Sequence, residues 1–212
     1  MSNTTFKKLG LLLDTSTEPT HLVLIEEKTP LTHCSIEGKE SCSRFLVMRL
    51  HQFLSSERYA LSDLGFIGAS QGPGSYTSLR VGATVAKSLA FALKIPLISF
   101  CSLKMYTPSS DGTFFVAMDA NTRGVYALEG EKKGSCITCG NPALIAHKDV
   151  PHLFAKSSQQ ICPKGDSLVQ KFAAFPFIEN TPNLHQMAEI AMQELIQKPP
   201  HGPYPKLDLL YL

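Results

Sequence analysis

This sequence has neither a long hydrophobic run nor a strong excess of charge of one sign. The first apolar run, residues 9–13, follows Lys7 and Lys8 and is too short for a signal-peptide core, and no later segment is long enough to span a bilayer. We therefore expect a cytoplasmic protein with no membrane contact. The 212 residues include 20 Lys and Arg against 18 Asp and Glu, a net charge of +2. This balance excludes a chain that binds nucleic acid through its net charge alone.

Several catalytic motifs are also missing. None of the seven histidines lies four residues from another, so no helix can present a pair of histidines to a metal. There is no P-loop. No Gly-Gly pair follows residue 107, although an actin-like kinase would need a glycine-rich adenosine loop in its second half. These absences favour a protein that acts without an active site of its own.

The six cysteines do not form the spacing of a structural metal site. In a cytoplasmic chain of this length they are expected to be reduced thiols. Cys136 and Cys139 have redox or metal spacing, but a structural zinc site usually needs two more ligands at defined spacing. The pair also lacks the strand-then-helix setting of a thioredoxin motif. We expect ordinary thiols in a strand or turn, and no metal.

Hydrophobic periodicity predicts an α/β protein with two lobes. A turn-rich stretch at 107–112 places the boundary between an N-terminal lobe, 1–107, and an abbreviated C-terminal lobe, 108–212. The predicted strands are 9–13, 20–26, 31–37, 64–70, 96–99, 113–119 and 124–129. The predicted helices are 41–54, 77–93, 147–156, 166–173 and 184–197, followed by an extended tail at 199–203.

The helix at 77–93 has more apolar surface than a helix resting on a sheet needs. Its apolar arc spans roughly 200°, whereas a surface helix needs little more than about 100°. Gly82, Ala86 and Ala90 recur every four residues, a spacing that lets another backbone approach closely. In the helix at 41–54, Phe45 and Met48 lie outside the core stripe. Periodicity alone cannot distinguish burial within one lobe from docking of a second chain.

If a second chain docks on these helices, a charged side chain on their apolar arc should prevent it. We expect that changing Ala83 or Ala86 to Arg abolishes dimer formation and leaves the lobe folded.

Two loops could bind phosphate, although both are also ordinary turns. Asp14, Thr15 and Ser16 end the first strand with an acid and hydroxyls, which also suit a capped turn. The stretch Gly72-Pro73-Gly74-Ser75 precedes a helix whose free N–H groups could receive an anion. A tight turn and helix cap explain the same residues.

These segments resemble the TsaB family, also called YeaZ. The resemblance rests on Leu12–Thr17, on Gln71-Gly72-Pro73-Gly74-Ser75-Tyr76-Thr77 with the Leu-Arg-Val-Gly that follows it, and on Ala86–Ala90. It continues through Ile95–Ser99 and reaches the hairpin around Asp119 and Gly124–Ala127. The match is strong over roughly residues 10–127 and thin beyond.

The resemblance implies a two-lobed actin-like, ribonuclease H-like (ASKHA) fold with a shortened second lobe. It implies a non-catalytic activator of a paralogous enzyme, TsaD, with a TsaE-like ATPase joining the assembly. The complex transfers threonylcarbamoyl to the adenosine 3′ of the anticodon in tRNAs that read codons beginning with A. On this basis the chain contacts tRNA only as part of the complex, and the isolated chain forms a homodimer. No cofactor is expected in the chain itself; any nucleotide bound is ATP or ADP at the interface of the complex.

The partner or dimer interface is expected on the two front helices. Its predicted residues are Phe45, Met48, Gln52, Leu79, Ala83, Ala86, Lys87 and Ala90. Asp14, Thr15 and Ser16 are the candidates for a vestigial phosphate site. The alternative is a working enzyme of the same fold, either an ATP-dependent transferase or a metallopeptidase-like protein.

Overall fold

The computed structural model describes residues 9–197, 207–210 and 212, with the backbone alone for 39–43. By contacts the chain divides into two units. The first comprises residues 1–100 and 184–209, and the second comprises residues 101–183 and 210–212. Each unit has a sheet of its own.

The five-stranded sheet of the first unit has the order β3-β2-β1-β4-β5. Its strands are β1 (Leu9–Asp14), β2 (Thr20–Glu26), β3 (Thr29–Ile36), β4 (Phe66–Gly72) and β5 (Leu97–Cys101). The central strand β1 pairs antiparallel with β2 and parallel with β4. Parallel strands need a crossover between them, and helix α1 (Lys39–Ser56) lies in the connection that returns the chain to β4.

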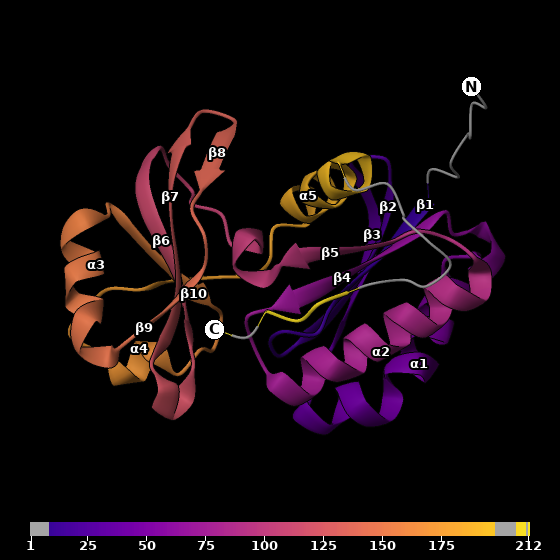
Figure 1. Cartoon of the computed structure of the whole chain (residues 1–212), viewed down its shortest axis with the longest axis horizontal. Helices are drawn as coiled ribbons and strands as arrows, with labels where there is room; N and C mark the ends of the chain where they lie inside the picture. The colour runs from indigo at the N-terminus through magenta and orange to yellow at the C-terminus, as the bar shows by residue number, and fades with distance from the viewer. Residues whose placement is uncertain (1–8, 198–206, 211) are drawn as a thin grey trace. The chain divides into compact units, whose positions relative to one another are not determined.

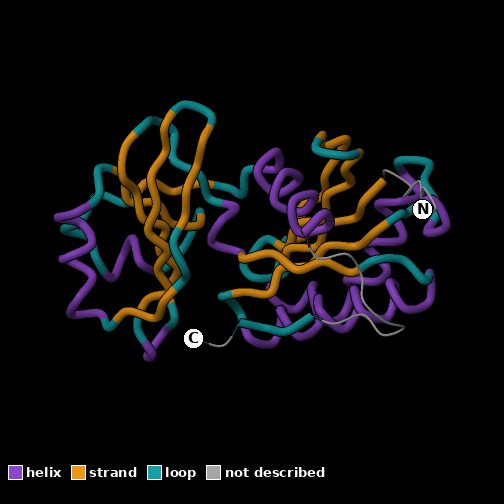
Figure 2. The backbone as a smooth tube through the Cα atoms, turned by 45° about the horizontal axis from the view of Figure 1, so that its top comes forward, coloured by secondary structure: helices purple, strands orange, loops and turns teal. Residues whose placement is uncertain are grey.

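Helices cover both faces of this sheet. Helices α1 and α2 (Tyr76–Leu93) lie side by side on one face, and α5 (Leu184–Gln197) lies on the other (Figures 1 and 2). Strand β1 is therefore buried at all six positions, LGLLLD. A strand covered on both faces has no solvent side, which explains why its sequence is a continuous apolar run.

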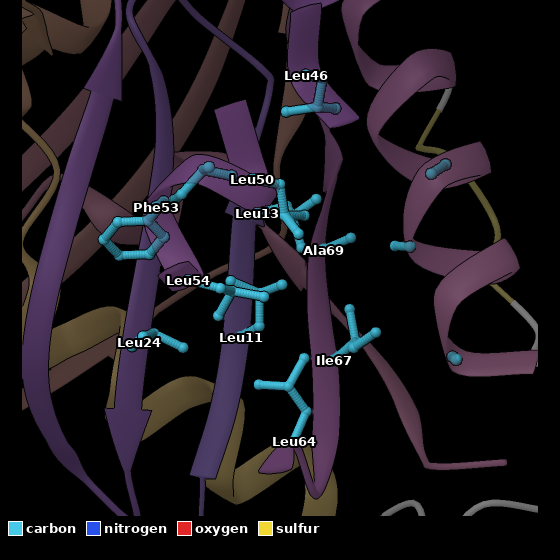
Figure 3. Close-up of a cluster of buried hydrophobic side chains, with 14 of the residues drawn as sticks. Leu11, Leu13, Leu24, Leu46, Leu50, Phe53, Leu54, Leu64, Ile67 and Ala69 are labelled. Atoms are coloured by element: carbon cyan, nitrogen blue, oxygen red, sulfur yellow. The ribbon is translucent and has the colours of Figure 1, made fainter. Parts of the chain in front are cut away.

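The core of the first unit lies between α1 and the central strands. Leu46, Leu50 and Phe53 of α1 belong to the same cluster of buried side chains as Leu11 and Leu13 of β1 (Figure 3). This spacing of three and four residues places one apolar stripe of α1 against the sheet.

The second unit repeats the local pattern around its own central strand. Its strands are β6 (Gly112–Asp119), β7 (Val125–Lys133), β8 (Cys136–Cys139), β9 (Ala143–Ile145), β10 (Gln159–Pro163) and β11 (Ile178–Asn180). Its helices are α3 (Val150–Lys156) and α4 (Leu168–Lys171). Strand β6 pairs antiparallel with β7 and parallel with β10, as β1 does with β2 and β4. Phe115 of β6 packs edge-on against Phe154 of α3, with 5.2 Å between ring centroids.

The α/β class and the elements of the front half are confirmed, as is the helix at 184–197. The short strands β8 to β11 were not predicted, except that a strand was one of two options for Cys136 and Cys139. Helix α5 belongs by contacts to the first unit, where it packs against β3, whereas the predicted lobe boundary at residue 107 assigned it to the second lobe. The predicted tail at 199–203 lies outside the described residues. Within the described part of the chain, no helix combines the length and hydrophobicity needed to cross a bilayer.

Candidate functional site

Helix α1 buries one stripe and leaves three large apolar side chains in solvent. Leu46, Leu50, Phe53 and Leu54 are buried in the core of the first unit. By contrast, Phe45 is 40% exposed, Val47 is 63% exposed and Met48 is 47% exposed. Single exposed apolar residues are common, but a run of them on one helix marks a surface suited to binding.

Helix α2 uses most of its wide apolar arc inside the unit. The side chains of Leu79, Ala83, Ala86 and Ala90 are at most 5% exposed. A second row of the arc packs against the same core and comprises the partly buried Val81, Val85, Leu89 and Leu93. Both rows of the arc therefore pack against the core of the first unit, and only the second row keeps part of its surface exposed.

This burial also changes the expected result of the arginine substitutions. An arginine at Ala83 or Ala86 would be buried without a partner, which costs several kcal/mol in the folded state. Those variants would test folding rather than docking. The interface stays a prediction and now depends on Phe45, Met48 and Gln52, which are exposed, and on the half-buried Lys87.

The exposed side of α2 combines aromatic and basic side chains. The Arg80 guanidinium lies over the Tyr76 ring, 3.9 Å from its centroid, and the Thr84 hydroxyl donates to the Arg80 carbonyl at 2.7 Å. Phe91 is 56% exposed on the same helix. Sequence reasoning missed Val47 and Phe91 as interface candidates. Phe91 could have been found, because it falls on the polar side of the helical wheel, with Arg80 and Thr84.

We call these exposed side chains the α1/α2 surface. It comprises the apolar residues Phe45, Val47, Met48 and Phe91 with Gln52, and the cations Arg44, Arg49, Arg80 and Lys87.

The turn after β1 is buried and braced by backbone hydrogen bonds. Asp14, Thr15 and Ser16 are at most 2% exposed. The Ser16 amide donates to Asp14 Oδ1 at 3.0 Å, and the Thr15 amide donates to the hydroxyl of Ser70 on β4 at 3.2 Å. The Ser75 amide donates to the Ser16 carbonyl at 2.8 Å. The turn is thus tied to β4 and to the start of α2.

Two glycines bring the chain directly onto this turn. A Cβ at Gly82 would lie 2.3 Å from Thr15 Oγ1, and a Cβ at Gly74 would lie 2.4 Å from the Ser16 carbonyl oxygen. A phosphate could therefore contact these three residues only if the segment at 72–75 or α2 moved. Asp14 Oδ2 and Ser16 Oγ are buried with no hydrogen-bond partner among the described residues. The phosphate site stays a prediction.

Buried His21 next to this turn should make stability depend on pH. His21 is 6% exposed, and its Nδ1 lies 3.2 Å from the Ser35 hydroxyl. Burial lowers the pKa of His21, with His33 acting in the same direction and the carboxylates of Asp14 and Glu37 opposing it. The unfolded chain then binds a proton more readily than the folded one, so stability is lost as pH falls through the unfolded pKa. We expect the free energy of unfolding to decrease from pH 7.5 to pH 5, with a smaller slope in His21→Gln.

The matched control for His21 is His152→Gln, at an exposed histidine in the second unit. Urea unfolding at each pH measures the slope. If His21→Gln kept the wild-type slope, the buried imidazole would not be its source.

Cys136 and Cys139 lie together in β8 but face away from each other. Successive side chains alternate across a strand, so residues three apart point to opposite faces. Cys136 is exposed, and burial raises the pKa of the half-buried Cys139. The strand position confirms the expected setting of these thiols. Within the described residues, no cluster of three or more His, Cys, Asp or Glu side chains could hold a metal ion.

A polar cluster in the second unit is an anchor between elements. Lys171 Nζ lies 2.6 Å from Asp119 Oδ2, and the Ser167 hydroxyl donates to the same oxygen. The Asn121 amide donates to Asp119 Oδ1 at 3.0 Å. Burial alone would raise the pKa of Asp119, but these donors outweigh it and hold the pKa below its usual value. Asp119 is therefore held as a charged group that ties the end of β6 to α4.

Comparisons with known proteins agree on one family. Residues 42–188 match the family model of TsaD, described as tRNA N6-adenosine threonylcarbamoyltransferase. The tRNA threonylcarbamoyladenosine biosynthesis protein TsaB of Bacillus subtilis is 33% identical over 119 residues, which cover 55% of this chain and 52% of that protein. The protein of the same name from Escherichia coli is 25% identical over 171 residues, covering 78% of this chain and 73% of its own length. The match thus spans about half of the Bacillus relative.

Two solved structures share the fold along nearly the whole chain. One is described as an uncharacterized protein with similarity to peptidase YEAZ from Pseudomonas aeruginosa. It has a TM-score of 0.74 and 21% identity, covering 97% of this chain and 99% of that one. YeaZ from Pseudomonas aeruginosa has a TM-score of 0.69 and 22% identity, covering 89% and 94%. These likenesses show that the chain shares the mixed α/β fold of the YeaZ structures. The chain belongs to the family that the TsaD model describes, and its relatives place it among the TsaB (YeaZ) proteins.

Proposed function

We propose that this chain acts in tRNA threonylcarbamoyladenosine biosynthesis as a non-catalytic subunit that activates a TsaD-like transferase. The observation that carries the proposal is the α1/α2 surface, where Phe45, Val47 and Met48 remain exposed on a folded helix of a TsaB-family chain. Solvent-exposed aromatic and methionine side chains are typical anchors of protein–protein interfaces.

The features of the interior support a binding role rather than a catalytic one. The turn at Asp14, Thr15 and Ser16, the candidate for a vestigial phosphate site, is covered by the chain itself. Asp119 is engaged by Lys171 and Ser167. A metal-dependent transferase that binds its metal through histidines on adjacent helical turns would need two histidines four residues apart, and the sequence has none.

The proposed assembly has three further members. The transferase supplies the catalytic site and transfers threonylcarbamoyl from its adenylate to the adenosine 3′ of the anticodon in tRNAs reading codons that begin with A. A TsaE-like ATPase joins this pair, and tRNA reaches the chain only through the complex. Without its partners the chain forms a homodimer, and any ATP or ADP binds at the interface of the complex.

Reconstitution tests the proposal. The purified chain, a TsaD-like transferase and a TsaE-like ATPase are combined with tRNA and labelled threonylcarbamoyl-adenylate, and label in tRNA is counted. We expect no transfer by the chain alone and transfer by the transferase that depends on the chain. Transfer by the chain alone would show that it is an enzyme. Equal transfer by the transferase with and without the chain would show that the chain is not an activator.

A further inference from the structure

The two helices of the α1/α2 surface carry a higher net positive charge than the chain as a whole. Over α1 and α2 the sequence has one acidic residue, Glu40, and five basic residues, so these helices have a net charge of +4. The basic residues are Lys39, Arg44, Arg49, Arg80 and Lys87. Because the whole chain has only +2, the remainder is net negative. The charge is therefore concentrated where the exposed apolar side chains lie.

The cations lie on the same two helices as the apolar residues of the α1/α2 surface. Arg44, Arg49 and Arg80 are exposed and Lys87 is half-buried. The Arg44 guanidinium lies 5.7 Å from the centroid of the Phe45 ring. Arg49 Nη1 lies 3.5 Å from Gln52 Oε1. Among the described side chains of the two helices there is no carboxylate.

Resting on the function proposed above, we propose that this surface selects a partner whose docking face is apolar and acidic, and that it disfavours a second copy of the chain. In a symmetric dimer the same patch meets itself, so two faces of +4 would be brought together. A face with carboxylates around an apolar centre would instead meet opposite charge. The apolar centre supplies affinity for either partner, and the charge decides between them.

A protein partner fits these residues better than RNA. Val47 and Met48 are aliphatic and exposed, and such side chains gain stability by burial against another apolar surface. RNA contacts would depend on phosphate neutralisation by many cations or on stacking platforms, neither of which needs Val47 or Met48. Binding of RNA is thus the competing outcome of the test.

The two kinds of association should respond to salt with opposite signs. Screening weakens attraction between unlike charges and repulsion between like charges. We expect the Kd between the chain and the purified TsaD-like transferase to rise by about tenfold or more from 50 to 500 mM NaCl. The homodimer of the isolated chain should become stronger over the same range. Sedimentation velocity measures both.

Charge reversal locates the effect on the surface. Arg49→Glu with Lys87→Glu should raise the Kd for the transferase by about tenfold or more at 50 mM NaCl, and by less at 500 mM. Lys28→Glu with Lys148→Glu is the matched control, because it makes the same change in net charge at exposed positions outside α1 and α2. The control should change the Kd by less than about twofold.

The outcomes separate this inference from the proposed function. No complex at either salt concentration would overturn the proposed function, and the inference with it. A complex whose Kd changes neither with salt concentration nor with charge reversal would overturn the inference alone. Equal losses of affinity in the charge-reversal variant and in the control variant would do the same. So would a homodimer that weakens with salt. Binding of tRNA by the isolated chain that the reversal abolishes, with transferase binding unchanged, would assign the surface to RNA instead.

Discussion

Replacing Phe45 and Met48 together with aspartate should abolish the activation of the transferase while the chain stays folded. Both side chains are at least 40% exposed, so the folded state loses little buried area when they are changed. In the complex they would lie at the centre of the contact, where a charge would be buried without a partner. Interface anchors of this kind cost about 2 kcal/mol or more each on truncation. Two of them, taken as additive, correspond to a Kd roughly 1,000-fold higher.

The matched control is Ile178→Asp on β11. Ile178 is 40% exposed, as is Phe45, but it lies in the second unit. We expect this control to keep wild-type affinity and activation, with both variants showing wild-type thermal unfolding. If Phe45→Asp with Met48→Asp activated the transferase as well as wild type does, the α1/α2 surface would not be the docking site. A lowered melting temperature would instead assign these side chains to the fold.

The elements of the front half could be predicted because their sequence pattern has a local physical cause. The run Leu-Gly-Leu-Leu-Leu before Asp14 is a strand covered on both faces. The helix at 184–197 was predicted with the bounds that the structure has, because its apolar residues recur with a helical period. The short strands β9 and β11 have three residues each, which is too few for any period to be recognised.

What each apolar helix face packs against could not be predicted, since it depends on contacts between residues that are far apart in the sequence. Periodicity showed that α2 has an unusually wide apolar arc, but not that residues of its own unit cover it. Leu207, more than 100 residues away, is 3% exposed in the same core cluster as Ala86. Two of the three exposed large apolar residues of α1, Phe45 and Met48, were identified because they fall outside the core stripe of that helix. Helical spacing thus identified the two helices of the α1/α2 surface but only some of its exposed residues.

The close approach of α2 to β1 gives the second large effect: valine at Gly82 should destabilise the first unit strongly. A Cβ at Gly82 would lie 2.3 Å from Thr15 Oγ1 and 2.8 Å from Thr15 Cγ2. Thr15 is 1% exposed, and its amide donates a hydrogen bond to the hydroxyl of Ser70 on β4. Thr15 therefore cannot move aside without disturbing β4. Overpacking of this kind costs about 1–3 kcal/mol for small additions and more for larger ones. We expect a loss of about 3 kcal/mol or more for Gly82→Val in urea unfolding.

Alanine at the same position gives a test of sign. In a helix, glycine-to-alanine normally stabilises by about 1 kcal/mol, so a neutral site would make Gly82→Ala more stable. The contact with Thr15 should reverse this and make Gly82→Ala less stable than wild type. Thr15→Ala removes both clashing atoms, so the double variant should recover about 1 kcal/mol relative to the sum of the single changes. Ser88→Ala, at an exposed position of the same helix, should show the ordinary gain from helix propensity. A Gly82→Ala protein more stable than wild type would show that α2 does not rest on the turn after β1.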